Sequence, residues 1–220
     1  MPHHHDVTAG YAVYTRVTLP LYDLWVHGLS NPWVWKCPTS ELLAMYDRHL
    51  SSNHLDVGVG TGFFLDRTTL PKEQSRLALM DANPRCLARA GRRLVRYRPE
   101  LIRHNVLQPI AWDGPPFDSI AVNYLLHCLP GPMPRKCKAL DHLLPLLRPG
   151  GVLFGATILG CGAACGPVAR HLMKLYQRRG IFGNGADDAA SLDESLHGRL
   201  TAVDLVVRGC VAMFSGVKRQ

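Results

Sequence analysis

The stretch Leu55-Asp56-Val57-Gly58-Val59-Gly60-Thr61-Gly62 decides the fold of this chain. The apolar pattern around it predicts a short strand over His54 to Gly58, and a helix is expected to begin near Phe63. The glycines therefore lie where a strand passes into a helix, and their missing side chains leave the main chain bare. Such a turn lets a ligand approach the backbone closely, so we expect a ligand site at this end of the strand.

Two classes of ligand use a glycine turn of this kind. Dinucleotide sites require Gly-x-Gly-x-x-Gly, but Phe63 occupies the position of the third glycine. Asp56 directly precedes the turn, where its carboxylate would repel a pyrophosphate and attract the ammonium of an amino-acid group, directly or through water. Asp81 ends the next expected strand, nineteen residues beyond Gly62, and a carboxylate there can accept both hydroxyls of a ribose. The pattern therefore disfavours a nicotinamide dinucleotide.

The rest of the chain alternates between strands and helices, which is typical of βαβ units around a parallel sheet. A helix is expected after Pro38, with Thr39 or Ser40 as its N-cap. The pattern further predicts a strand over 76–81, a helix from Asn83-Pro84 to about Tyr97 that buries Leu87, Gly91 and Leu94, a strand over 117–124, a helix from after Pro134 to about Leu147, a Pro149-Gly150-Gly151 turn before a strand over 152–156, and an antiparallel pair over 202–207 and 210–216.

Four motifs carry a resemblance to a known family. They are the glycine stretch, Leu79-Met80-Asp81, Phe117-Asp118-Ser119-Ile120 and Leu147-Arg148-Pro149-Gly150-Gly151. In this order they resemble the signatures of class I S-adenosylmethionine-dependent methyltransferases, above all small bacterial or fungal enzymes that act on small molecules. The resemblance implies an α/β, Rossmann-like fold with a mostly parallel seven-stranded sheet, an antiparallel C-terminal strand and helices on both faces. It covers about residue 38 to the C-terminus, so we expect an aromatic-rich helical lid over 1–37 and the methyltransferase domain over 38–220.

The resemblance also implies a cofactor site for S-adenosylmethionine. By position, the three glycines would face the methionine part, Asp81 the ribose, and Asn123 the sulfonium. Asn105 and Val106 would flank the adenine; the family often has Asp where Asn105 stands, but an amide can both donate to adenine and accept from it. The expected cofactor-binding residues are Tyr22, Asp56, Gly58, Gly60, Thr61, Gly62, Asp81, Ala82, Asn105, Val106 and Asn123.

His127 is the candidate catalytic residue, in Asn123-Tyr124-Leu125-Leu126-His127-Cys128. An imidazole there is expected to act as a general base or to orient the methyl acceptor; the alternative is a loop histidine bonded to backbone. The family's adenine and amide methylases usually carry Asn/Asp-Pro-Pro-Tyr here, and both prolines are missing from this chain. The expected acceptor-binding residues are Tyr14, Trp25, Tyr124 and His127.

Aromatic residues are concentrated before the fold proper. In this family an N-terminal helix commonly closes over the cofactor and the acceptor, and aromatic rings there would exclude water and favour a sulfonium by cation–π contact. The alternative is that some of them pack on the edge of the sheet. The residues concerned are Tyr14, Tyr22, Trp25 and Trp35. Leu21, Leu24, Trp25 and Leu29 lie near helical spacing, and that helix is expected to stop at Asn31-Pro32.

Composition excludes several classes of protein. With 220 residues, 47% hydrophobic and 19% charged, the chain is expected to form one globular domain, or a domain with a small appendage, and is neither disordered, collagen-like nor coiled coil. Its seven cysteines include no Cys-x-x-Cys pair, so we expect reduced thiols, a cytoplasmic protein and no metal site. The uncharged stretch 149–169 contains many glycines, which predicts a buried strand and a glycine-rich loop rather than a membrane span.

The net charge of +8 leaves more than one function open. The arginines of the helix over 84–97 are expected to form a solvated outer face, although an RNA-tracking stripe is an alternative. We expect methyl transfer to N, O or C of a small aromatic or hydrophobic metabolite of secondary metabolism. An RNA or protein methyltransferase, and a cyclase or isomerase that binds the cofactor without methyl transfer, remain alternatives. The expected partner is a small-molecule acceptor, with no nucleic acid and no membrane, and the protein is expected to be a monomer or homodimer.

Overall fold

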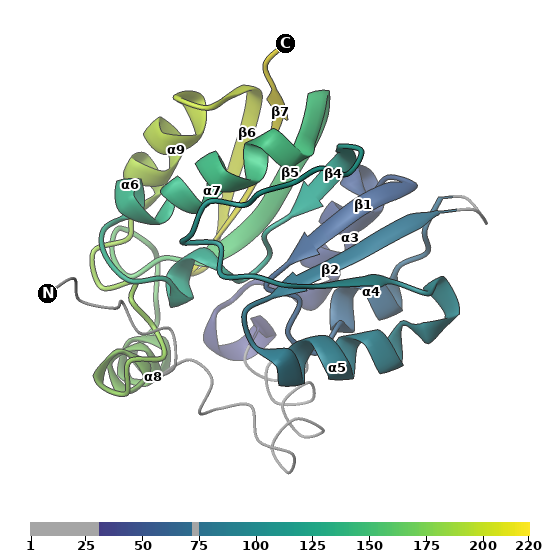
Figure 1. The fold of residues 1–220 in the computed structure, drawn as a ribbon. Helices are drawn as coiled ribbons and strands as arrows, with labels where there is room; N and C mark the ends of the chain where they lie inside the picture. Colours follow the sequence, from purple (N-terminus) through teal and green to yellow (C-terminus); the bar gives the residue numbers. More distant parts are fainter. Residues whose placement is uncertain (1–30, 72–74) are drawn as a thin grey trace, which may run out of the picture.

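A seven-stranded sheet forms the centre of the molecule, in a computed structural model that describes residues 31–71 and 75–220 (Figure 1). The strand order is β3-β2-β1-β4-β5-β7-β6, and only β7 runs antiparallel to its neighbours. The expected sheet, with its antiparallel C-terminal strand, is therefore confirmed. The strands are β1 (Asn53–Val57), β2 (Arg76–Asp81), β3 (Glu100–Arg103), β4 (Phe117–Ala121), β5 (Leu147–Ile158), β6 (Leu200–Arg208) and β7 (Val211–Lys218).

Two strands differ from the sequence-based expectation. β4 ends at Ala121 rather than Tyr124, although the N–H groups of Val122 and Tyr124 still donate to Phe154 and Ala156 of β5 at 2.9 and 2.7 Å. The chain then turns at Tyr124, where φ is 56°. Pro149-Gly150-Gly151, expected as a turn before a strand, lies inside β5. There Gly150 has a φ of 71°, and the register between β4 and β5 shifts between Phe117 and Ser119. The motif is thus an irregularity within a longer strand.

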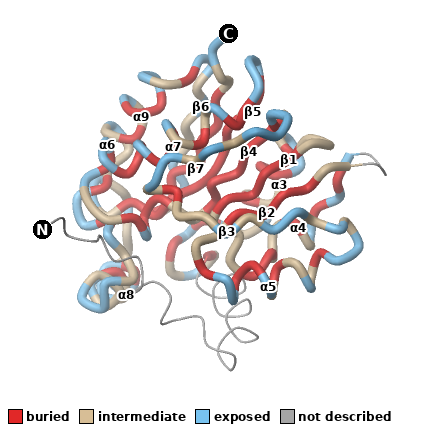
Figure 2. Tube along the Cα trace, viewed as in Figure 1, coloured by how far each residue is buried: buried red, intermediate tan, exposed pale blue. Residues whose placement is uncertain are grey.

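Helices cover both faces of the sheet, as expected (Figure 1). On one face, Tyr46, Leu65, Leu87 and Met173 share one hydrophobic cluster with Phe154 of β5. These residues belong to α3 (Thr39–His49), α4 (Phe63–Arg67), α5 (Pro84–Arg93) and α8 (Pro167–Arg178). The other face is covered by η3 (Leu126–Cys128), α6 (Met133–Lys136), α7 (Lys138–Leu143), η4 (Leu144–Leu146) and α9 (Ala189–His197). Figure 2 shows that the inner strands β1, β2, β4, β5 and β7 are largely buried, whereas the edge strands β3 and β6 are largely half-buried or exposed.

Several helix boundaries correct the expectations. The N-cap of α3 is Pro38, without a side-chain capping bond, instead of Thr39 or Ser40. α5 ends at Arg93 and continues as the 3-10 turn η2 (Val95–Tyr97). The single helix expected up to Leu147 is three short pieces. Cys137 separates α6 from α7, and α7 passes directly into the 3-10 turn η4, which β5 follows. The sequence analysis did not predict α8 and α9.

The described part of the expected lid, residues 31–37, packs into the methyltransferase body. A π-helical turn covers 31–34, so Asn31-Pro32 lies within a helical turn. Trp35 and Cys37 are buried, and the carbonyl oxygen of Trp35 accepts a hydrogen bond from the backbone N–H of Cys210 at 2.8 Å. Within residues 31–71 and 75–220, no helix is long and apolar enough to cross a membrane. The uncharged stretch 149–169 is the buried strand β5 followed by a loop and the start of α8.

Candidate functional site

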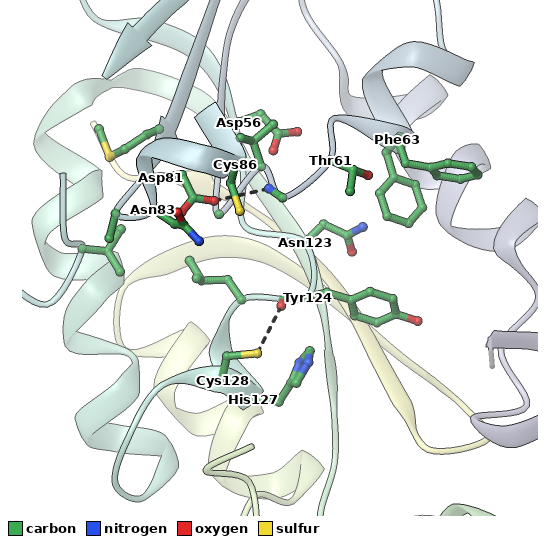
Figure 3. Close-up of a pocket in the computed structure, with 18 of the residues that line it drawn as sticks. Asp56, Thr61, Phe63, Asp81, Asn83, Cys86, Asn123, Tyr124, His127 and Cys128 are labelled. Carbon is green, nitrogen blue, oxygen red and sulfur yellow. Dashed lines mark hydrogen bonds between the residues drawn. The ribbon is translucent and has the colours of Figure 1, made fainter. Parts of the chain in front are cut away.

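One pocket lies at the carboxyl ends of β1, β2, β3, β4 and β5, the edge at which ligands bind in open α/β sheets (Figure 3). The glycine turn forms one side of it. Aromatic and aliphatic side chains from the segments after β4 and α8 form the opposite side. The expected site residues in its lining are Asp56, Gly58, Gly60, Thr61, Gly62, Asp81, Ala82, Asn105, Val106, Asn123, Tyr124 and His127. The expected Tyr14, Tyr22 and Trp25 lie outside the described residues.

Each of the three positions in the turn requires glycine for its own structural reason. All have positive φ, at 71°, 55° and 74° for Gly58, Gly60 and Gly62. A Cβ on Gly58 would lie 2.9 Å from Leu125, and one on Gly62 would lie 3.2 Å from Ala90 of α5. A Cβ on Gly60 would meet only a carbonyl oxygen 4.0 Å away. Gly58 and Gly62 therefore allow close packing within the protein, whereas Gly60 leaves open space in the pocket lining.

Asp81 is held by backbone donors at the end of β2. Its carboxylate accepts hydrogen bonds from the N–H of Asn83 at 2.8 Å and of Gly60 at 3.3 Å (Figure 3). Burial raises the pKa of the Asp81 carboxyl to about 6, although these two hydrogen bonds act in the opposite direction. The carboxylate thus joins the glycine turn to the N-terminus of α5 and still lines the pocket.

Asp56 is buried below the glycine turn and accepts a hydrogen bond from the hydroxyl of Tyr46, 2.8 Å away. Burial raises the pKa of the Tyr46 hydroxyl, and the nearby Asp56 carboxylate raises it further. His54 lies on the same strand, with its Nε2 3.8 Å from the carboxylate. Tyr46 lines the pocket but was not among the residues expected there, because its partner on β1 is ten positions away in the sequence.

An arginine of α5 supports the glycine turn from outside the pocket. Arg93 donates to the carbonyl oxygen of Thr61 at 3.0 Å and to its hydroxyl at 3.2 Å. Both Arg93 and Arg96 pair with Asp66 of α4. The expectation of a solvated arginine face is therefore wrong for Arg93, although Arg92 is exposed as expected.

Asn105 and Val106 follow β3 and line the same pocket. The side-chain oxygen of Asn105 accepts from the N–H of Leu107 at 3.1 Å, which fixes the turn. Val106 is buried, and its carbonyl oxygen lies 2.8 Å from Nδ1 of His142 on α7. These contacts hold the turn after β3 against the rest of the domain.

Asn123 and Tyr124 follow β4 in the centre of the pocket. Asn123 is 6% exposed, and within the described chain neither its amide nitrogen nor its amide oxygen has a hydrogen-bond partner. An unpaired buried amide costs about 1–3 kcal/mol, so this side chain is poised for a ligand. Tyr124 adopts its positive φ here, and its hydroxyl donates to the side-chain oxygen of Asn31 at 3.0 Å.

His127 is buried in η3, and its burial and the contacts of Nδ1 determine the charge and the tautomer of the imidazole. The backbone N–H of Ile158 donates to Nδ1 at 3.4 Å, and the Thr157 hydroxyl lies 3.5 Å from the same atom. Burial lowers the pKa of the imidazole to about 3, and the charge of Lys136 lowers it further. At neutral pH the ring is therefore uncharged, and because Nδ1 accepts, the proton resides on Nε2. His127 can thus donate a hydrogen bond from Nε2.

Aromatic rings surround the imidazole. Phe182 lies edge-on to it, with ring centroids 4.6 Å apart, and Tyr124 lies edge-on from another side at 5.6 Å. Tyr176 and Trp35 contact Phe182 in turn, at 5.0 Å and 6.0 Å. Sequence analysis missed Tyr176, Ile181 and Phe182; the apolar pair Ile181-Phe182 between two glycines was the available signal.

The features of this pocket fit S-adenosylmethionine. The open space at Gly60 admits a ligand against the backbone, the Asp81 carboxylate can accept from hydroxyls, and the unpaired amide of Asn123 offers a donor and an acceptor. Within the described ranges, no group of three or more His, Cys, Asp or Glu side chains could hold a metal ion.

Comparisons with known proteins identify the family. Residues 55–153 match the methyltransferase domain family. The chain is 39% identical to demethylluteothin O-methyltransferase of Streptomyces thioluteus over 95% of this chain and 91% of that protein, and 36% identical to the physcion biosynthesis cluster O-methyltransferase of Aspergillus chevalieri over 99% of both.

Solved structures agree on the fold. The N-methyltransferase NodS of Bradyrhizobium japonicum, in complex with S-adenosyl-L-homocysteine, superposes with a TM-score of 0.59 at 19% identity, over 83% of this chain and 88% of that one. An O-methyltransferase family protein of Burkholderia thailandensis gives a TM-score of 0.65 at 17% identity, over 92% of this chain and 60% of that one. With the pocket described above, these relationships show that the chain belongs to the class I S-adenosylmethionine-dependent methyltransferases and methylates small molecules.

Proposed function

We propose that this enzyme methylates a hydroxyl oxygen on a small planar aromatic metabolite. The carrying observation is His127, a neutral imidazole with its proton on Nε2, enclosed by the rings of Phe182 and Tyr124. Stacking and edge contacts with such rings favour a flat apolar ligand. The named O-methyltransferases of Streptomyces thioluteus and Aspergillus chevalieri support oxygen as the acceptor atom.

The cofactor half of the pocket would hold S-adenosylmethionine, which when bound supplies an electrophilic methyl group on its sulfonium. Asp81 would accept from the ribose hydroxyls, and Asp56 would attract the ammonium of the methionine part. Asn105 and Val106 would flank the adenine, with Ala82 beside the ribose. The turn residues Gly58, Gly60, Thr61 and Gly62 would lie along the methionine part, and Asn123 would pair its free amide near the sulfonium.

The acceptor half would orient the reacting hydroxyl. The acceptor hydroxyl would ionise by releasing its proton to solvent water, and His127 would donate from Nε2 to the resulting oxygen anion, which stabilises and aligns it. This oxygen would then form a bond to the methyl carbon as the carbon–sulfur bond of the cofactor breaks. Its lowered pKa makes His127 a weak base, so we assign the expected catalytic role to orientation rather than proton removal. Tyr124 would pack against the acceptor ring. Tyr14, Tyr22 and Trp25 would close the pocket as part of a lid.

A matched set of acceptors tests this proposal. The protein would be incubated with S-adenosylmethionine and 2-naphthol, 2-naphthylamine or cyclohexanol, and methylated products and S-adenosylhomocysteine would be measured by mass spectrometry. We expect methyl transfer to the naphthol and little to the other two. A preference for the amine would overturn the acceptor atom, and a preference for cyclohexanol would overturn the aromatic class.

We further propose that the enzyme works in the cytoplasm as a monomer or homodimer, without nucleic acid or membrane. The named small-molecule relatives support this over an RNA or protein substrate. Sedimentation measures the oligomeric state, and salt-sensitive binding to RNA would contradict the proposal.

A further inference from the structure

A buried ion pair contacts the segment that carries Phe182, one of the aromatic residues that line the pocket. Lys136 of α6 and Asp187, in the segment before α9, pair with side chains that are both 0% exposed. The Lys136 ammonium also donates to the carbonyl oxygen of Gly183 at 3.0 Å. One buried cation therefore bonds two points of the segment that carries Phe182.

The segment Ile181–Gly183, which we call the acceptor wall, is held on its other side as well. The N–H of Gly183 donates to the carbonyl oxygen of His127 at 2.8 Å. A Cβ on Gly183 would lie 2.3 Å from the carbonyl oxygen of Leu129, so the two backbones are in close contact. Gly183 thus joins the Lys136 ammonium to the backbone of His127 itself.

Further bonds fix the segment to the end of β5. The Asn184 amide donates to the carbonyl oxygen of Ile158 at 3.0 Å. The carbonyl oxygen of Asp187 accepts from the N–H groups of Gly160 at 2.9 Å and Cys161 at 3.1 Å. These bonds use the backbone of Asp187, so they would survive replacement of its side chain.

Stability alone is a weak reason for such a pair. Desolvation of two charges offsets most of their attraction, and well-packed apolar replacements of similar volume are often neutral or stabilising. The bonds to Gly183 give the pair a different role, because they determine where Phe182 and His127 meet.

We propose that Lys136 and Asp187 are positioning residues that fix the acceptor wall against His127. The pair touches neither reacting atom; it sets the distance between the imidazole donor and the ring of Phe182. The inference rests on the proposed function in one respect, that the acceptor binds between these two side chains.

The double variant Lys136→Met with Asp187→Leu separates positioning from stability. Unfolding by urea should show stability equal to or above that of the parent protein. Hydrogen exchange of residues 181–187 should quicken at least tenfold, while exchange in the glycine turn stays unchanged. The KM for 2-naphthol should rise about tenfold, as expected for a lost buried hydrogen bond, and affinity for S-adenosylhomocysteine should change less than twofold.

Two further variants complete the test. Arg148→Met with Asp118→Leu removes an exposed ion pair in the same chemical way and should leave exchange and KM unchanged. Asp187→Asn leaves the Lys136 charge uncompensated and should destabilise the fold, which the double variant should reverse.

Unchanged exchange and KM in the folded double variant would overturn the proposal. Hydrogen exchange and the affinity for S-adenosylhomocysteine can both be measured without a methyl acceptor. Faster exchange at 181–187 with no turnover of any naphthyl compound by the parent would therefore retain the anchor and reject the acceptor class.

Discussion

The two halves of the pocket are built by different means. The cofactor half consists of backbone turns at successive strand ends, where positive-φ glycines and main-chain N–H groups supply the geometry. The acceptor half combines Tyr124 and His127, which follow β4, with the segment between α8 and α9. Lys136 holds that segment from more than forty residues away in the sequence. The geometry of the cofactor half is therefore determined mainly by local sequence, whereas that of the acceptor half depends on hydrogen bonds between residues far apart in the chain.

The largest expected effect breaks the cofactor half at its open glycine. Gly60→Val places a β-branched side chain at φ 55° and fills the space in the pocket lining. Calorimetry should show affinity for S-adenosylhomocysteine reduced by more than about a hundredfold, because the valine side chain would occupy space that the ligand needs. Gly150→Val is the control, because Gly150 has a φ of 71° and open space but lies outside the pocket. Equal losses in both variants would mean that strain, and not the ligand space, matters.

A second change tests whether the acceptor half works by donation. His127→Ala should lower kcat for 2-naphthol by about 10²-fold, the effect of removing one aligned donor, and leave cofactor-product affinity unchanged. His127→Gln, which retains an N–H donor, should recover part of the kcat that is lost in His127→Ala. Because the imidazole pKa is lowered to about 3, kcat should show no inflection between pH 5 and 8 that depends on His127. An inflection near pH 6.5 that the variant removes would instead identify His127 as a general base.

Asp81 gives the cofactor half a pH dependence that the acceptor half lacks. Ribose binding requires the ionised carboxylate, and its pKa is raised to about 6, so affinity for S-adenosylhomocysteine should fall as the pH drops below 6. Asp81→Ala should weaken binding by about 10- to 150-fold, the equivalent of 1.5–3 kcal/mol for charge-assisted hydrogen bonds. It should also remove the pH dependence. A loss of less than threefold would assign Asp81 a structural role only.

The smallest expected loss of affinity tests whether the cofactor half also depends on a distant side chain. Arg93→Met removes two hydrogen bonds to Thr61 and should weaken S-adenosylhomocysteine binding about three- to tenfold. Arg92→Met, on the exposed face of the same helix, should have no effect. Identical affinities for both variants would show that the glycine turn holds its shape without the arginine.

The sequence predicted those features whose cause is local. β2 has the predicted bounds, Arg76–Asp81, because an apolar run that ends in an acid and a cap is a strong strand signal. The β6–β7 pair was likewise readable from two apolar segments around Arg208-Gly209. The glycine turn and Asp81 line the same pocket, and their contact with the cofactor stays a prediction.

The features that escaped prediction depend on distant partners. The tautomer of His127 is determined by the backbone of Ile158, and the role of Arg93 by Thr61. α8 and α9 had readable signals, since Pro167 begins one and Asp188 caps the other by accepting from Ser191. The charged residues Lys136 and Asp187 carry no motif, so their burial could not be read from the chain.

The place of β7 in the sheet also has a consequence for biosynthesis. β7 pairs with β5 on one side and with β6 on the other, although β6 precedes it in the chain. β6 therefore cannot join the sheet until residues 211–218 have left the ribosome. Until then β5 has an unpaired edge beside the buried Phe154 and Ile158, a surface prone to pairing with other chains. The interval before residues 211–218 emerge is thus a stage at which the chain is prone to aggregation and at which a chaperone would protect the β5 edge.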